Sequence, residues 1–241
     1  MVTPILEIDS VKKRFGGLTA VNNLSFNVNA RETVGLMGPN GAGKTTLINL
    51  IFGVYRPDSG AIRFNGNIIA GLSPHKICHL GIARTYQVPQ PFSTLTALQN
   101  IMVAAIYGKG LSKAEAEARA TEILKDLDLS SKKNTITADM DEVALKRLEL
   151  ARALATKPSL LLIDEVAAGL NEEELPRVLE ILKTIRETGV TILLIEHVMK
   201  VMTEAVDRII VIDRGEKIAE GVPDEVMKNS KVIEAYLGEP E

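Results

Sequence analysis

A glycine-rich segment, residues 38–46 (GPNGAGKTT), constrains the fold of this chain more than any other feature. It matches the pattern GxxxxGK(S/T), in which glycines allow successive backbone N–H groups to converge on a phosphate. In such a loop Lys44 reaches the β- and γ-phosphates, and the Thr45 hydroxyl is placed to bind Mg²⁺. The helix that follows points its positive end at the anion. The segment predicts that a nucleoside triphosphate is bound by Gly38, Asn40, Gly41, Gly43, Lys44, Thr45 and Thr46.

The residues on both sides of the loop fit the strand–loop–helix arrangement that it requires. Residues 32–37 are predicted to form a short buried strand, and residues 47–52 continue as a helix that Gly53 ends. A chance match in a glycine-rich turn is the alternative, and the flanking pattern argues against it.

Short apolar runs alternate with helical patterns along most of the chain. Residues 160–163, 190–195 and 208–212 are apolar runs of the length of central strands, and residues 171–187 have the apolar spacing of a helix. Pro176 is tolerable in that helix because it lies in the first turn. This alternation predicts an α/β fold with a largely parallel sheet.

The middle of the chain differs from its two ends. Residues 88–155 contain few β-branched runs and several helical patterns, including the Ala/Glu-rich segment 113–127. We therefore predict a nucleotide-binding α/β core from residues 1–87 and 156–241, interrupted by a helical lobe at 88–155.

Two acidic residues follow the apolar run at 160–163. Strand ends place such carboxylates beside the phosphate loop, where Asp164 would hold Mg²⁺ through water and Glu165 would polarise the attacking water. Standing alone, the pair could be two solvated acids. Together with the loop, the pair predicts phosphoryl transfer to water.

Two further polar residues end strand-like segments. His197 directly follows the apolar run at 190–195, and a neutral imidazole there could contact the γ-phosphate. Gln87 ends the segment 82–86 and is a candidate to sense Mg²⁺ and the attacking water. A lone histidine is more often structural, but this position favours a functional role.

Composition limits the classes of function. The net charge is −3, with no run of basic residues, which argues against broad nucleic-acid binding. We expect no transmembrane span and no signal peptide, and therefore a cytoplasmic chain that reaches a membrane through another protein. The single cysteine, Cys78, agrees with a reducing compartment.

The motifs together resemble the ATP-binding subunits of ABC transporters over essentially the whole chain, and those of branched-chain amino acid importers in particular. The residues that carry the resemblance, besides the phosphate loop, are 15–18 with 20–21, 81–87, 147–154, 167–171, 195–197, 220–221 and 235–238.

This resemblance implies a phosphate-loop ATPase core with a mostly parallel sheet, an N-terminal antiparallel β portion and an inserted helical lobe. It implies that Phe15 stacks on adenine and that two ATPase chains close head to tail around two ATP molecules with Mg²⁺. The lobe would dock on integral membrane permease subunits at the inner face of the cell membrane, and a solute-binding protein would take part indirectly.

The chain departs from the family pattern at the signature, LSGGQ or LSYGQ, which precedes the helix at 147–154. Met140–Ala144 stands in its place, so that Asp141 offers a carboxylate where a donor belongs and Val143 adds a side chain where backbone must approach closely. Two like charges about 4 Å apart near a surface repel by roughly 4 kcal/mol. Locally, Asp141 is a good helix N-cap and Glu142 suits the positive helix end. Val166 is a second departure, since the family has proline there.

Three functions remain open at this point. The chain is a working ATPase, or a degenerate-signature subunit that pairs with a different ATPase, or a nucleotide-binding regulatory protein without turnover. The residues leave open whether the dimer is a homodimer or a heterodimer.

One further cluster is a candidate metal site. His75, Cys78 and His79 would share one helix face, but zinc needs a fourth ligand or a water. We therefore expect no metal there.

Overall fold

The computed structural model describes residues 4–169 and 172–237. Contacts within the chain divide it into two units, one formed by Met1–Pro74 with Thr191–Glu241 and the other by His75–Val190. The core and lobe boundaries at residues 88 and 155 stay a prediction. Each unit has its own sheet strands and its own buried apolar residues.

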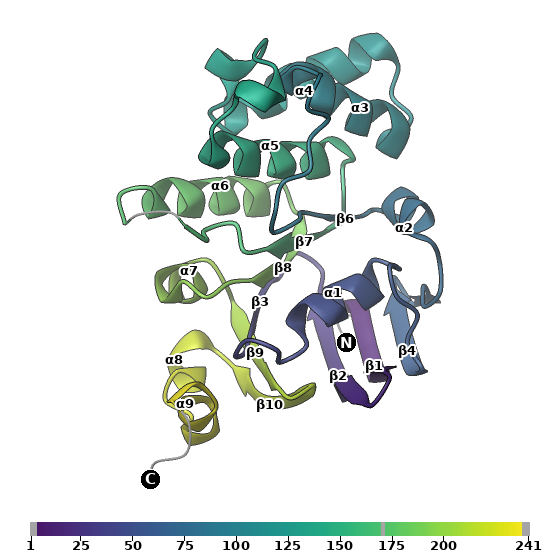
Figure 1. Ribbon diagram of the computed structural model, residues 1–241, viewed down its shortest axis with the longest axis vertical. Coiled ribbons are helices and arrows are strands. Elements are labelled where there is room, and N and C mark those ends of the chain that lie inside the picture. Colours follow the sequence, from purple (N-terminus) through teal and green to yellow (C-terminus); the bar gives the residue numbers. More distant parts are fainter. Residues whose placement is uncertain (1–3, 170–171, 238–241) are drawn as a thin grey trace. The chain divides into compact units, whose positions relative to one another are not determined.

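The first unit begins with an antiparallel sheet (Figure 1). Its strands are β1 (Pro4–Phe15), β2 (Leu18–Asn29), β4 (Ser59–Phe64) and β5 (Asn67–Ile68), in the order β2-β1-β4-β5. Gly16 has a φ of 56° at the turn from β1 to β2, a conformation that glycine adopts without strain. The expected N-terminal antiparallel portion is thereby confirmed.

The first unit also contains the strand that precedes the phosphate loop. β3 (Thr33–Met37) pairs in parallel with β8 (Thr191–Ile195) and β9 (Arg208–Asp213), and β10 (Glu216–Gly221) is antiparallel to β9. Every residue of β3 and β8 is buried, as the continuous apolar runs predict for central parallel strands. The helices of this unit are α1 (Lys44–Ile51), α7 (Met199–Glu204), α8 (Pro223–Val226) and α9 (Ser230–Leu237).

The second unit combines a pair of parallel strands with most of the helices. β6 (Ile82–Arg84) pairs with β7 (Leu160–Asp164), and α3 (Ala97–Lys109), α4 (Lys113–Asp126) and α5 (Glu142–Ala155) pack on one another (Figure 1). Capping boxes at Thr96 and Ser112 begin α3 and α4. The other elements are α2 (Pro74–Leu80), α6 (Leu175–Glu187) and the short 3₁₀ turns Ser130–Lys132 and Thr137–Asp139.

One predicted helix begins later than expected. α6 begins at Leu175 with Pro176 in its first turn, and residues 172–174 form turns instead of the predicted helical start at 171. Proline lacks the backbone N–H that a helix interior uses, so the first turn is the place where it fits. Asn171 itself lies outside the described residues.

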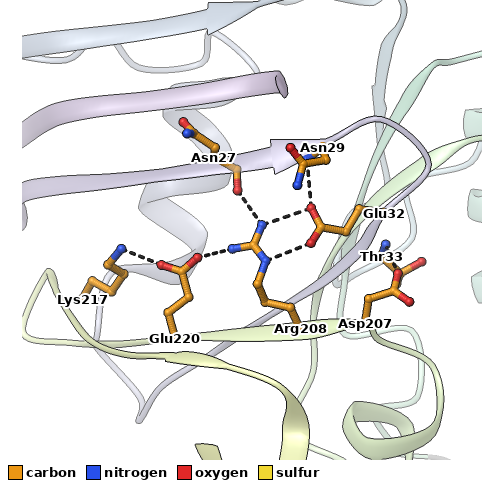
Figure 2. A network of polar contacts seen from close by, with 8 residues as sticks. All are labelled: Asn27, Asn29, Glu32, Thr33, Asp207, Arg208, Lys217 and Glu220. Atoms are coloured by element: carbon orange, nitrogen blue, oxygen red, sulfur yellow. Dashed lines mark hydrogen bonds and ion pairs between the residues drawn. The ribbon is translucent and has the colours of Figure 1, made fainter. Parts of the chain in front are cut away.

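A polar network ties the strands of the first unit together (Figure 2). The Arg208 guanidinium donates to both carboxylate oxygens of Glu32, at 2.8 and 3.1 Å, and to the Asn27 carbonyl at 2.7 Å. It also pairs with Glu220, which Lys217 contacts at 2.6 Å. Burial acts to raise the pKa of Glu32, but the hydrogen bonds from Arg208 and Asn29 and the charge of Arg208 outweigh it and hold that pKa below its usual value.

Within the part of the chain that the structure describes, no helix combines the length and apolar character needed to cross a lipid bilayer.

Candidate nucleotide-binding site

The phosphate loop leaves the carboxyl end of β3 in a conformation that only glycine can take at two positions. Gly38 has a φ of 149°, and a Cβ there would lie 2.0 Å from the Ile212 carbonyl oxygen. Gly43 has a φ of 105°, and its Cβ would lie 2.3 Å from the Ala20 carbonyl oxygen. Any side chain at Gly38 or Gly43 would therefore clash with backbone atoms, so the path of the loop depends on these two glycines.

Lys44 is the first residue of α1 and lies folded over the loop. Its side chain is buried, with 7% of the residue exposed, and its ammonium donates to the carbonyls of Gly38 at 2.6 Å and Pro39 at 3.0 Å. Asn40, Gly41 and Thr45 are exposed along the same loop and first turn, and Thr46 is half-buried. The backbone N–H groups at this helix start form the type of site that binds phosphate.

His197 lies at the same sheet edge as the loop. Leu36 of β3 pairs with Ile195 of the parallel strand β8. Gly38 comes two residues after Leu36 and His197 two residues after Ile195, so both follow the carboxyl ends of neighbouring strands. His197 is exposed, while the carboxylate of the buried Glu196 accepts from the His197 N–H at 3.1 Å. The register therefore places His197 at this edge of the sheet, and its contact with a ligand there stays a prediction.

Phe15 ends β1 in the same unit and is 40% exposed. Its ring lies edge-on to Tyr55, with 5.1 Å between ring centroids, and the Lys13 ammonium lies 5.4 Å from the Phe15 centroid. Sequence analysis missed Tyr55, because the residues are distant along the chain and no local pattern links them.

The second unit brings Gln87, Asp164 and Glu165 together. Arg84 of β6 lies opposite Leu162 of β7, and three residues further on the Gln87 amide donates to the Glu165 carboxylate at 2.6 Å. Glu165 has a φ of 53°, a left-handed conformation that is uncommon for a residue with a side chain. The sequence placed Gln87 and Glu165 only at the same sheet edge, and the structure adds the hydrogen bond between them.

Asp164 is nearly fully buried, with 4% of the residue exposed. Its backbone N–H donates to the Thr85 hydroxyl at 3.1 Å, and its carboxylate lies 4.0 Å from the Arg84 guanidinium. Burial lowers the pKa of Arg84, against the opposing charges of Tyr86, Asp164 and Glu149. Arg84 lies within residues 81–87, which carry part of the family resemblance, but the sequence alone predicts no role for it.

A tyrosine near the C-terminus contacts the phosphate loop. The Tyr236 hydroxyl of α9 accepts a hydrogen bond from the Gly38 N–H at 2.9 Å. Burial raises the pKa of Tyr236 against the effect of this hydrogen bond. Sequence analysis gave Tyr236 no role, since the two residues are 198 positions apart and only the fold joins them.

The altered signature begins α5 as a capped helix. The Asp141 carboxylate accepts from the Ala144 N–H at 2.8 Å, and the Lys132 ammonium lies 3.6 Å from it. The hydrogen bond from Ala144, followed by the charge of Lys132, lowers the pKa of Asp141 although its partial desolvation acts to raise it. The predicted N-cap is confirmed, and Glu142 lies in the first turn of the helix as expected.

The two departures from the family pattern share one apolar hollow in the second unit. Val143 and Val166 both line it, together with Lys146, Arg147, Leu150, Val178, Ile181 and Leu182. The Lys146 ammonium also donates to the Ala168 carbonyl, which fixes the start of α5 to the segment after β7. Of the motif at 167–171, Leu170 and Asn171 lie outside the described residues.

The histidine and cysteine cluster lies on α2, as the helical spacing suggested. The ring of His79 is hydrogen-bonded to the Tyr107 carbonyl at 3.0 Å, and burial raises the pKa of Cys78. Among residues 4–169 and 172–237, no group of three or more His, Cys, Asp and Glu side chains could hold a metal ion.

Comparison with known proteins agrees with this geometry. Residues 21–168 match a family model described as ABC transporter, and residues 216–241 match one described as branched-chain amino acid ATP-binding cassette transporter. The chain is 39% identical to the high-affinity branched-chain amino acid transport ATP-binding protein BraF of Pseudomonas aeruginosa, over 99% of this chain and 100% of that protein.

Solved structures show the same likeness. The ADP conformation of MJ1267, an ATP-binding cassette of an ABC transporter, has a TM-score of 0.88 and 31% identity over 98% of this chain and 100% of that one. The dimeric post-hydrolysis cassette MJ0796, bound to ADP and Pi, has a TM-score of 0.83 and 26% identity over 90% of this chain and 98% of that one. The chain belongs to the ABC transporter family as an ATP-binding cassette, and it is a nucleotide-binding ATPase.

Proposed function

We propose that this chain powers an importer of branched-chain amino acids or similar small polar solutes. The class of solute is inferred mainly from the C-terminal segment, because residues 216–241 match the family model for branched-chain amino acid cassettes. The full-length likeness to BraF supports the same class.

The residues suited to binding and hydrolysing ATP fall into two groups, one in each unit. In the first unit, Phe15 stacks on adenine, the loop N–H groups and Lys44 hold the β- and γ-phosphates, and His197 contacts the γ-phosphate. In the second unit, Glu165 accepts a proton from the attacking water while Gln87 holds its carboxylate.

The donor set suits Mg²⁺. In the first unit the Thr45 hydroxyl is an oxygen donor beside the phosphate loop, and in the second unit the Gln87 amide and the Asp164 carboxylate are oxygen donors at one strand end. Mg²⁺ prefers such oxygen donors and takes few protein ligands besides phosphates and water. The ion supplies neutralisation of charge on the transferring phosphoryl group. Asp164 would hold it through water.

The partners follow from the exposed surface of the second unit. Tyr86, Val88 and Phe92 are large exposed apolar side chains just after β6, and we assign this docking face to a permease subunit. The chain would then lie at the cytoplasmic face of the cell membrane, beside a second cassette and, indirectly, a solute-binding protein.

A second candidate rests on the altered signature. The Asp141 carboxylate is exposed beside Glu142, where a partner's γ-phosphate would approach. A cassette with this signature would complete its dimer with a different ATPase subunit that supplies an intact one.

Uptake measurements test the proposal. The complex captured through the tagged chain is reconstituted in vesicles with internal ATP, and radiolabelled leucine uptake is followed for the native chain and for Glu165→Gln. Uptake that requires ATP and is lost in Glu165→Gln supports the proposal. Leucine uptake equal in the two complexes contradicts it.

A further inference from the structure

A buried guanidinium lies behind the carboxylate that would hold Mg²⁺. Arg84 and Asp164 are both almost fully buried from solvent, and the Arg84 Nη2 lies 4.0 Å from the Asp164 Oδ2. β6 and β7 are neighbouring parallel strands in which Arg84 lies opposite Leu162, two residues before Asp164, and the Thr85 hydroxyl accepts a hydrogen bond from the Asp164 backbone N–H. A buried carboxylate and guanidinium at this distance form an ion pair with little solvent screening, so the position of one constrains the position of the other.

The guanidinium is held from two other directions. Its central carbon lies 4.3 Å from the ring centroid of Tyr86, which is 40% exposed. The carboxylate of Glu149, on α5, acts on Arg84 electrostatically and is itself bonded to Arg152 at 2.8 Å. A guanidinium stacked on an aromatic face keeps a fixed plane that an ammonium would not.

The same cluster reaches the docking face. Arg152 donates to the Gln90 carbonyl at 2.7 Å and lies 5.4 Å from the ring of Phe92. The exposed segment from Tyr86 to Phe92 is therefore joined to Asp164 by side chains of the same unit, with Arg84 nearest the carboxylate.

We propose that Arg84 is a positioning residue for the metal site, which it serves by orienting the Asp164 carboxylate through their buried ion pair while the Tyr86 ring fixes the guanidinium. The inference rests on the proposed role of Asp164 as the Mg²⁺ carboxylate. Arg84 itself touches neither the ion nor ATP. A movement of Tyr86 at the docking face would act on the metal site through this guanidinium.

The test measures metal binding apart from turnover. Mn²⁺ replaces Mg²⁺, and its binding to the ATP-loaded chain is followed from the loss of the free-ion signal in electron paramagnetic resonance. Arg84→Met removes the charge at similar length, Arg84→Lys keeps a charge without the flat fork, and Tyr86→Ala removes the ring. Tyr107→Ala is the control, because Tyr107 is an exposed tyrosine of the same unit, outside the cluster.

The expected result is graded. Arg84→Met weakens Mn²⁺ binding about tenfold, Arg84→Lys recovers part of that loss, and Tyr86→Ala weakens binding two- to fourfold, while Tyr107→Ala matches the native chain. Affinity for ATP in EDTA stays within twofold in all of them. Native Mn²⁺ binding in both Arg84→Met and Tyr86→Ala, or an equal loss in Tyr107→Ala, overturns the inference.

A folding defect is distinguishable from these outcomes. If Arg84→Met fails to fold, the exposed Tyr86→Ala and Tyr107→Ala pair still decides the question. Failure of the proposed function has another signature, since a chain without leucine uptake or ATP turnover can still bind Mn²⁺ with or without the dependence on Arg84.

Discussion

Tyr236 gives the phosphate loop a contact from the far end of the chain. Its hydroxyl satisfies the N–H of Gly38, whose side of the backbone is closed by Ile212. We expect Tyr236→Phe to raise the KM for ATP about fivefold with kcat within twofold, because a lost hydrogen bond costs about 1 kcal/mol. Steady-state kinetics with Tyr107→Phe as the control measure this. Equal KM values for the two variants would show that the hydroxyl does not hold the loop.

At the level of single residues, the phosphate loop could be predicted because each position has a local chemical requirement. Gly38, Gly43 and Lys44 have the conformations and contacts that this requirement implies. The contacts of Arg84 and Tyr236 could not be predicted from the sequence. Strand pairing brings Asp164 near Arg84, and the packing of α9 brings Tyr236 to Gly38.

The start of α5 is the element that the altered signature changes most. Replacing Asp141 by alanine removes the cap on Ala144, and we expect a loss of about 1 kcal/mol in the free energy of unfolding at pH 7. Urea unfolding measures it. Asp141→Ser keeps a capping oxygen and should lose only a few tenths of a kcal/mol.

The same cap makes the stability depend on pH. The pKa of Asp141 is lower in the folded chain than its ordinary value, so folding favours the ionised form. This contribution is complete above the unfolded pKa and is lost as the pH falls through the folded one. The difference between the native chain and Asp141→Ala should therefore shrink from pH 7 to pH 3, while the difference between Asp141→Ser and Asp141→Ala stays constant. If the difference in unfolding free energy between the native chain and Asp141→Ala stays constant from pH 7 to pH 3, the charge of Asp141 does not contribute to the cap.

Val143 and Val166 belong to different elements but line one hollow. We expect Val143→Ala and Val166→Ala to be non-additive by at least about 0.5 kcal/mol in unfolding free energy, because each changes the packing of the other. A double-mutant cycle by urea unfolding measures the coupling. Pairing Val143→Ala with Val222→Ala, on an exposed position of the other unit, should give simple addition. Additivity in both cycles would mean that Val143 and Val166 do not affect each other's packing.

Elements were predictable where burial is continuous. The runs at 160–163, 190–195 and 208–212 became β7, β8 and β9, since strands buried on both faces leave an uninterrupted apolar signal. Boundaries were less predictable. β6 ends at Arg84, although Thr85 still donates to the Leu162 carbonyl at 2.9 Å, so the predicted strand overran by the residues that turn toward Gln87.

For the whole molecule, the class of fold followed from alternating patterns and a known loop, and the solved cassettes confirm it. The limits of compact units depend on tertiary contacts that no local pattern records. β6 and β7 pair within the unit that holds the helices α3, α4 and α5, and its limits at residues 75 and 190 lie outside the predicted lobe.

The altered signature also makes a prediction about assembly. On a Glu165→Gln background with MgATP, Asp141→Ser should raise the association constant of the dimer at least about tenfold, because like charges about 4 Å apart repel by up to roughly 4 kcal/mol. Light scattering over a range of protein concentrations measures the mass. Asp126→Ser, on an exposed residue of α4, is the control. An unchanged association constant in Asp141→Ser would favour completion of the site by a different subunit.

Phosphate release by the purified chain at saturating MgATP shows whether the intact catalytic residues turn over ATP despite the altered signature. We expect steady release that falls about a hundredfold or more in Glu165→Gln, because that variant lacks the general base. Release is expected to be unchanged in Glu117→Gln, on an exposed residue of α4. Release that is the same in the native chain and in Glu165→Gln would contradict this expectation.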